Sequence, residues 1–206
     1  MAVEIQQIDL EHPHRRLLQH AARILADGGL IVYPTDTIYG LGADLFNKGA
    51  MERIFKLKKA SRPKLLSFVC LDLAQVADWA YVPTSAYRIL RRVTPGKYTF
   101  VLRASKQVPK ILLQKRPTVG VRIPDSAVAL GLARELGRPL LSTSVPQGAD
   151  DFFTDPQEIA ATFRNDVELV LDAGVLANQP STIIDLSGPA PVLLRAGAGP
   201  VEPFGL

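Results

Sequence analysis

The chain has 206 residues, of which 47% are hydrophobic and 21% are charged, so it can bury the core of one or two domains and is not a disordered protein. Its single cysteine, Cys70, excludes an intrachain disulfide and a cysteine metal cluster, and this usage fits a reducing compartment. The first residues lack the basic and apolar parts of a secretion signal, and no apolar run approaches the ~18 residues that a membrane helix needs. We therefore expect a cytoplasmic protein with no membrane partner.

The first half of the chain alternates between helical and extended patterns. Residues 14–26 carry apolar side chains at helical spacing, and Gly28 and Gly29 end that helix. An apolar run over residues 30–33 predicts the strand that follows it. The next expected elements, in chain order, are a helix over 48–59, a strand over 65–71, helices over 73–79 and 85–93, a strand over 98–102, a short helix over 109–113 and a strand over 118–123.

The second half continues the alternation and closes with a hairpin. Asp155 and Pro156 mark a helix start, because Asp is a favoured cap and Pro suits the first helical position. The other expected elements are a helix over 126–136 and strands over 139–143, 168–172, 181–186 and 192–195, the last two of which form the hairpin. With about seven strands and at least one antiparallel connection, this order predicts a single α/β domain built on a twisted, open, mixed β-sheet with flanking helices. We expect the domain to span residues 1–206, with its core at about 14–200.

The charge is unevenly distributed, although the net charge is only +4. Between Trp79 and Pro124 there is no Asp or Glu, and ten basic residues occur there: Arg88, Arg91, Arg92, Lys97, Arg103, Lys106, Lys110, Lys115, Arg116 and Arg122. Such a distribution favours anionic partners, either the phosphates of a nucleotide or those of RNA. The alternative is that these side chains are spread over a solvated surface, because their spacing is irregular. Charge alone leaves both interpretations open.

Small hydroxyl or basic residues follow several of the apolar strands. Thr35 and Thr37 flank Asp36 after the first strand, and we expect their hydroxyls side by side, because alternate residues of a strand share a face. Gly40 and Gly42 then allow a sharp turn or a close approach to a ligand. The other strand ends carry Thr99, Thr118, Arg122, Ser142, Thr143, Ser144, Ser181, Thr182 and Arg195. Each residue alone has an ordinary structural role, but together they predict a site for a carboxylate and a phosphate chain where the strand ends gather.

Other kinds of site are less well supported. His12, His14 and His20 all lie near the N-terminus, where surface positions are expected, so no metal site is predicted. No histidine follows His20, which argues against a Ser/His/Asp hydrolase triad. The sequence has neither the dinucleotide-binding glycine pattern nor the P-loop pattern. Cys70 lies in an apolar strand, and we expect a buried, inert thiol.

Seven segments spread over the chain resemble, in order and spacing, the motifs of the YrdC/YciO family. They are residues 34–42 (PTDTIYGLG), 54–58 (IFKLK), 94–99 (TPGKYT), 118–124 (TVGVRIP), 142–144 (STS), 181–186 (STIIDL) and 194–197 (LRAG). The resemblance covers about residues 29–195. It implies the YrdC-like fold, a twisted open α/β sheet with a large, basic, concave cavity.

The characterised branch of that family forms threonylcarbamoyl-AMP from threonine, bicarbonate and ATP, with release of pyrophosphate, for the threonylcarbamoyl modification of adenosine in tRNA. The resemblance implies the same activity here, with Mg²⁺ bound to ATP and no strong general base, because the carbamate nucleophile is already an anion. It places the substrate threonine at Thr35, Thr37, Arg122 and Ser181. It places the nucleotide at Lys58, Arg62, Thr118, Ser142, Thr143, Ser144 and Arg195, with Lys58 and Arg62 as the catalytic cations.

Three differences from the family pattern make the chain resemble the YciO branch more closely. The basic motif, a tight Lys-x-Arg followed by Asn-Pro-Leu, is spread here from Lys58 to Arg62 and followed by Leu65-Leu66-Ser67. The family's histidine aligns with Cys70, and its Ser-Ala-Asn aligns with Ser144-Val145-Pro146. Two alternatives to the synthase therefore stay open, namely a protein that binds double-stranded RNA or tRNA, and a hydrolase of a related adenylate. In each case we expect a monomer or a homodimer.

Overall fold

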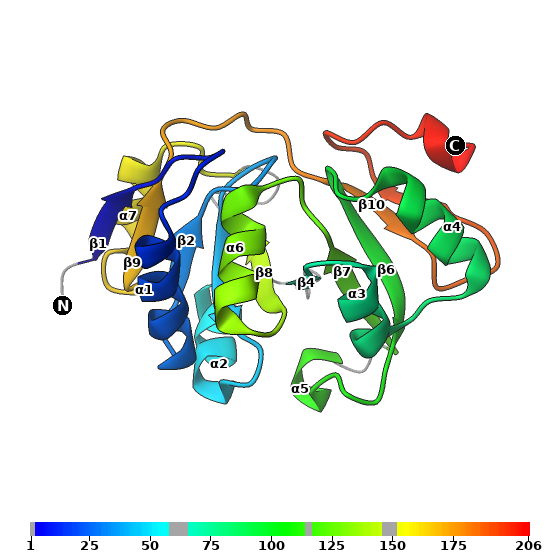
Figure 1. Cartoon of the computed structure of the whole chain (residues 1–206), viewed down its shortest axis with the longest axis horizontal. Coiled ribbons are helices and arrows are strands. Elements are labelled where there is room, and N and C mark those ends of the chain that lie inside the picture. Colours follow the sequence, from blue (N-terminus) through cyan, green and yellow to red (C-terminus); the bar gives the residue numbers. More distant parts are fainter. Residues whose placement is uncertain (1–2, 58–65, 114–116, 146–151) are drawn as a thin grey trace.

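The computed structural model describes residues 3–57, 66–113, 117–145 and 152–206, and these contain eleven strands in one mixed sheet (Figure 1). The strand order is β1-β9-β2-β3-β8-β4-β7-β6-β10-β11, with β5 paired to β6. The strands are β1 Glu4–Gln7, β2 Ile31–Tyr33, β3 Gly40–Asp44, β4 Ser67–Val69, β5 Ala80–Tyr81, β6 Tyr98–Ala104, β7 Thr118–Arg122, β8 Leu140–Ser144, β9 Leu169–Asp172, β10 Thr182–Asp185 and β11 Val192–Arg195. The sheet contains both parallel and antiparallel pairs, and β2 runs parallel to β9 and antiparallel to β3. The predicted single α/β domain on an open mixed sheet is confirmed.

Helices flank this sheet, and their ends follow the caps that the sequence supplies. They are α1 Arg15–Ala26, α2 Lys48–Leu57, α3 Leu73–Trp79, α4 Thr84–Val93, α5 Lys110–Leu113, α6 Ala127–Leu136, α7 Pro156–Phe163 and the 3-10 helix η1 Glu202–Phe204. Asp155 caps α7 as predicted, because its side chain accepts a hydrogen bond of 2.8 Å from the Gln157 N–H. Gly28, just after α1, has a φ of 88°, which favours glycine there. None of the helices in the described ranges is both long and apolar enough to cross a bilayer.

Three strands, β1, β3 and β5, are absent from the sequence predictions. β1 precedes the expected core and pairs with β9 at one edge of the sheet. β3 matters most, because the sequence predicts no strand there but a sharp turn or a close approach to a ligand at Gly40 and Gly42, and the sharp turn is not formed. Both glycines lie in a fully buried strand between β2 and β8. Glycine is depleted in strands, so the segment carries little strand signal of its own.

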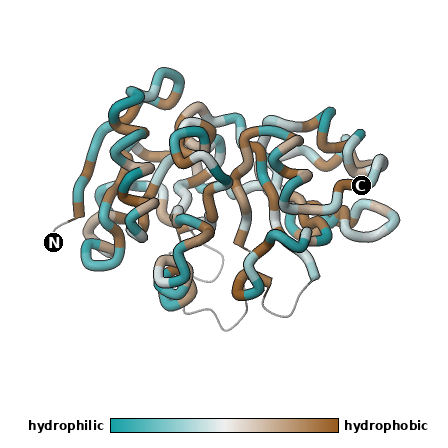
Figure 2. Tube along the Cα trace, turned by 60° about the horizontal axis from the view of Figure 1, so that its bottom comes forward, coloured by the Kyte–Doolittle hydropathy of each residue, from teal (hydrophilic) through white to brown (hydrophobic). Residues whose placement is uncertain are grey.

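Alternate strand residues pack into two clusters, one on each face of the sheet. On one face Phe68 and Leu141 pack with residues of α2, α3, α4 and α7. On the other face Val69 and Leu140 pack with residues of α1 and α6. Figure 2 shows hydrophobic segments along the central strands and hydrophilic segments on the outer turns. The central strands therefore form the buried middle layer of the molecule, while the edge strands β1 and β11 are mostly exposed.

The face that carries α1 and α6 is covered only in part. These two helices pack closely, since a Cβ at Gly131 of α6 would lie 2.6 Å from Cδ1 of Leu18 of α1. Ser67, Arg122 and Ser142 belong to the same face, because they alternate with residues that pack on the opposite one. Their polar side chains line a cavity instead of a helix interface.

Candidate ligand-binding site

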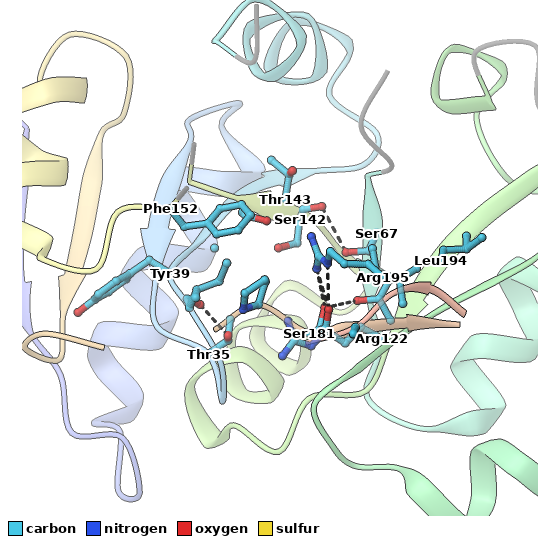
Figure 3. Close-up of a pocket in the computed structure, with 17 residues that line it drawn as sticks. Thr35, Tyr39, Ser67, Arg122, Ser142, Thr143, Phe152, Ser181, Leu194 and Arg195 are labelled. Atoms are coloured by element: carbon cyan, nitrogen blue, oxygen red, sulfur yellow. Dashed lines mark hydrogen bonds between the residues drawn. The ribbon is translucent and has the colours of Figure 1, made fainter. Parts of the chain in front are cut away.

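A cavity of about 660 Å³ lies on this partly covered face (Figure 3). Its walls come from the loop between β2 and β3 and from β4, β6, β7, β8, β10 and β11. The strand register brings distant segments together, because Ser67 stands opposite Ser142, and Ile183 stands opposite both Thr99 and Arg195. The lining residues are Thr35, Ile38, Tyr39, Gly40, Ser67, Thr99, Arg122, Ser142, Thr143, Ser144, Phe152, Pro180, Ser181, Ile183, Leu194, Arg195 and Ala196.

Arg122, the last residue of β7, forms the most buried cation of the cavity. Its side chain is 10% exposed and its Nη2 donates to Oδ1 of Asp36 and, at 2.9 Å, to Oγ1 of Thr37. Among the described residues, its Nε is a buried nitrogen without a hydrogen-bond partner. Buried polar groups normally have a partner. The unpaired Nε–H therefore indicates a place where a ligand oxygen would complete the arrangement.

The threonines before β3 form a hydrogen-bond chain that ends at Arg122. Thr35 Oγ1 donates to the Ile38 carbonyl at 2.7 Å, so Thr37 must be the donor in the 3.1 Å contact between the two hydroxyls. Thr35 Oγ1 also accepts from the Thr37 N–H at 3.1 Å, which fills its donor and both acceptor positions. The two hydroxyls lie side by side as expected, although the residues form a turn and not a strand. In this arrangement the pair orients Arg122.

Arg195, at the end of β11, is the second cation of the cavity. Its Nε and Nη2 donate to the Ser181 carbonyl at 3.2 and 2.8 Å, and Figure 3 shows it beside Ser181 and Arg122. Burial, and then the charge of Arg122, lower the pKa of the Arg195 guanidinium. A partly desolvated guanidinium that is anchored on a carbonyl suits an anionic ligand, because an anion would relieve both effects.

The neighbouring loop approaches Ser181 very closely. A Cβ at Gly197 would lie 2.2 Å from the Pro180 carbonyl oxygen, and the Gly197 N–H donates to Thr182 Oγ1 at 3.0 Å. The glycine two residues after Arg195 thus lets the chain that follows β11 pass close to the Ser181 carbonyl that anchors the arginine. Ser181 Oγ in turn lies 2.8 Å from Thr99 Oγ1 of β6.

A third group of hydroxyls surrounds Ser142 of β8. The Tyr33 hydroxyl lies 2.5 Å from Ser142 Oγ, and Ser67 Oγ donates to the Ser142 carbonyl at 3.4 Å. Tyr33 is fully buried, and burial raises its pKa to about 12, so it stays neutral at physiological pH. Its ring lies across β3, where a Cβ at Gly40 or Gly42 would be 2.9 or 3.1 Å from a ring carbon. The two glycines thus make room for the tyrosine that holds Ser142.

This close packing makes Gly40 a sensitive position. We expect Gly40→Ala to lower the free energy of unfolding by about 1–3 kcal/mol, because the added methyl group overpacks against the Tyr33 ring. Urea unfolding measures this change. The penalty should shrink in a Tyr33→Leu background, which removes the ring. An undiminished penalty there would show that the strand itself, and not Tyr33, requires glycine.

Most of the predicted site residues come together in the cavity, and some do not. Those that line it are Thr35, Arg122, Ser142, Thr143, Ser144, Ser181 and Arg195, while Thr37 contacts Arg122 from behind. Thr118 does not line the cavity. It is the first residue of β7, opposite Arg103, whereas Arg122 is the last, and the two lie about 13 Å apart along the strand. Lys58 and Arg62, together with Pro146, lie outside the described residues.

Several residues of the site carry no role in the sequence predictions. Asp36 pairs with Arg122, Tyr33 holds Ser142, and Ser67 and Phe152 line the cavity. Ser67 stands where the family pattern has leucine, and this departure was the signal that could have identified it. Phe152 follows no motif and is brought to the cavity only by the chain path. Cys70 is 0% exposed, and burial raises the pKa of its thiol, as expected for an inert cysteine.

The chemistry open to this cavity is binding and orientation. Its described lining residues include hydroxyls and two guanidinium groups, and none of them is a carboxylate, a histidine or a cysteine. The sheet and the cavity together define an α/β domain whose site suits ligands with carboxylate and phosphate groups. The family model Sua5_yciO_yrdC, described as telomere recombination, matches residues 23–197, and the chain therefore belongs to this family.

Individual relatives agree with this assignment. Escherichia coli YciO is 40% identical to this protein, and the alignment covers 94% of this chain and 95% of the YciO chain. The crystal structure of E. coli YciO superimposes with a TM-score of 0.94, covering 98% of this chain and 99% of the YciO chain. The Pyrococcus abyssi threonylcarbamoyl-AMP synthase is 33% identical over 88% of this chain and 54% of its own length. The structure of Pyrococcus abyssi Sua5 complexed with L-threonine has a TM-score of 0.88 at 30% identity, covering 98% of this chain and 59% of that one. The sequence prediction of a YrdC-like protein similar to YciO is confirmed.

Proposed function

We propose that this protein forms threonylcarbamoyl-AMP from threonine, bicarbonate and ATP and releases pyrophosphate. Threonine's amine and bicarbonate give a carbamate and water. A carbamate oxygen then bonds to the α-phosphorus as the bond to pyrophosphate breaks. No strong base is needed for this step, but the anionic nucleophile must approach a polyphosphate, and cations have to offset their repulsion.

The observation that carries the proposal is the pair of guanidinium groups that face one hydroxyl-lined cavity. Arg122 is balanced by Asp36 and has an unpaired Nε–H, while Arg195 is anchored on a neutral carbonyl. An amino-acid carboxylate fits the first, and a phosphate chain fits the second. A Pyrococcus abyssi relative of the same fold has been crystallised with L-threonine, and a Pyrococcus abyssi relative is named a threonylcarbamoyl-AMP synthase, which supports threonine and an adenylate as ligands.

The residue roles follow from these positions. Arg122 and Ser181 hold threonine, with Thr35 and Thr37 orienting Arg122 from its other side. The nucleotide lies against Arg195 and against the hydroxyls of Ser142, Thr143 and Ser144 at the end of β8. Lys58 and Arg62 are proposed as the cations of the polyphosphate, on the motif alone, and Mg²⁺ arrives bound to ATP.

Pyrophosphate release from ATP by the purified protein tests this function. We expect release that requires both threonine and bicarbonate, and a fall of about 10- to 100-fold in Lys58→Ala, because hydrogen bonds from a cation contribute about 1.5–3 kcal/mol. Lys48→Ala is the matched control, since Lys48 is an exposed lysine whose partner is Glu52 on the same helix. Absence of release from a protein that still binds ATP would overturn the synthase and favour hydrolysis of a related adenylate.

RNA binding is the second candidate, and the exposed face of α4 favours it. Arg88, Arg91 and Arg92 of this helix are all exposed, with no acidic residue in the helix. A phosphate-contacting surface of this kind gives an affinity that falls steeply with salt. A protein that releases no pyrophosphate but binds double-stranded RNA with such a salt dependence would move the assignment to this function.

A further inference from the structure

Asp36 does not line the cavity itself but pairs with Arg122, which does. Its side chain is 5% exposed, its Oδ1 accepts from Arg122 Nη2, and its Oδ2 accepts from the Asp125 N–H at 3.1 Å. One oxygen is thus held by a cation and the other by the backbone just after β7. Because both of its oxygens are engaged, Asp36 can affect a ligand only indirectly, through the position of Arg122.

Arg122 is fixed from one side only. Both contacts of its Nη2 go to the same loop, to Asp36 and to Thr37, and Thr37 is itself fixed through Thr35. The Nε–H is buried and has no partner within the described ranges. The loop therefore sets the plane of the guanidinium and leaves the Nε–H for a ligand.

Asp36 also sets the charge balance of the cavity. Arg122 lies close enough to Arg195 for its charge to lower the pKa of that guanidinium. Without a carboxylate beside Arg122, two like charges would face one partly buried space, and such a pair is unfavourable. With Asp36 in place, the Arg122 end carries no net charge and the Arg195 end is positive.

We propose that Asp36 is a positioning residue that holds Arg122 in the orientation needed to bind the amino-acid carboxylate. Its effect on substrate rests on the proposed function, whereas its effect on Arg122 does not. Asp36 compensates the charge of Arg122, whereas Arg195 contacts only a neutral carbonyl. The cavity should therefore favour a ligand that places its phosphate groups at Arg195 and a separate carboxylate at Arg122. Thr37 supports the same orientation through a single hydroxyl.

The first test is independent of any activity. We expect the buried Arg122 Nε–H to give an NMR cross peak in the ligand-free protein, which its absence in Arg122→Lys would assign. In Asp36→Asn we expect this proton to exchange with solvent at least about 10-fold faster, since the lost charge-assisted hydrogen bond contributes about 1.5–3 kcal/mol. Asp125→Asn is the matched control, because it changes an exposed carboxylate and keeps the backbone N–H that Asp36 uses. An unchanged exchange rate in Asp36→Asn would overturn the proposal.

The second test separates positioning from a general loss of structure. In pyrophosphate release, Asp36→Asn should raise KM for threonine by about 10-fold and leave KM for ATP nearly unchanged. Thr37→Val, which removes one hydroxyl and no charge, should shift the same constant in the same direction by less, and it serves if Asp36→Asn does not fold. Equal changes in both KM values would refute positioning. A wild-type protein without activity would refute the proposed function and with it the role toward threonine, while the exchange test still decides whether Asp36 orients Arg122.

Discussion

Replacing Arg195 by alanine is expected to weaken ATP binding, and with it pyrophosphate release at subsaturating ATP, by about 10- to 100-fold. The Arg195 guanidinium is half-buried and anchored on the Ser181 carbonyl, and burial lowers its pKa, so its charge is only partly solvated. A hydrogen bond from such a group to a phosphate contributes about 1.5–3 kcal/mol, which corresponds to that loss. Equilibrium binding of ATP and steady-state kinetics measure it.

Two further variants make this prediction specific. Arg195→Lys keeps the charge but loses the planar fork that contacts Ser181, so we expect an intermediate affinity for ATP. Arg88→Ala removes an exposed arginine of α4 and should leave ATP binding unchanged. If Arg195→Ala retained its ATP affinity while losing threonine affinity, the two ends of the cavity would have to be assigned the other way round.

The sequence was sufficient to predict the elements that carry a strong periodic or capping signal. α1 has apolar residues at helical spacing and a terminal Gly28, and α7 begins at Asp155 and Pro156, as their caps indicate. The antiparallel pair of β10 and β11 is also confirmed. Hydroxyl and basic residues at strand ends identified most of the polar side chains that line the cavity, because an open sheet gathers such positions.

What the sequence did not reveal depends on contacts between distant strands. The local sequence indicates a sharp turn or a close approach to a ligand at Gly40 and Gly42. Only the Tyr33 ring that packs on them explains their presence in β3. Thr118 shares a motif with Arg122, yet the length of β7 separates the two. Asp36 belongs to the motif at residues 34–42, but its role was not predicted, because that role arises from a partner 86 residues away. Local propensity and spacing carry no information on such pairs.

The strongest effect on stability is expected at the pair of Arg122 and Asp36. Arg122→Gln should lower the free energy of unfolding by about 3–5 kcal/mol, because it leaves the 5%-exposed Asp36 carboxylate without its counterion. Urea unfolding at neutral pH measures this change, with the slope m as a check that the transition stays two-state. Arg15→Gln is the matched control, since it breaks an ion pair with Glu135 in which Arg15 is 78% exposed, and its effect should be small.

The double variant shows whether the loss comes from the unpaired charge. Adding Asp36→Asn to Arg122→Gln removes the buried carboxylate, so the double variant should be more stable than Arg122→Gln alone, although each single change destabilises the protein. Strictly additive losses would mean that the two side chains do not interact in solution, and the account of Asp36 as the counterion of Arg122 would fail. A recovery of stability without recovery of threonine binding would separate the two tasks of Arg122, since the neutral pair restores the packing of the loop but offers no cation to a carboxylate.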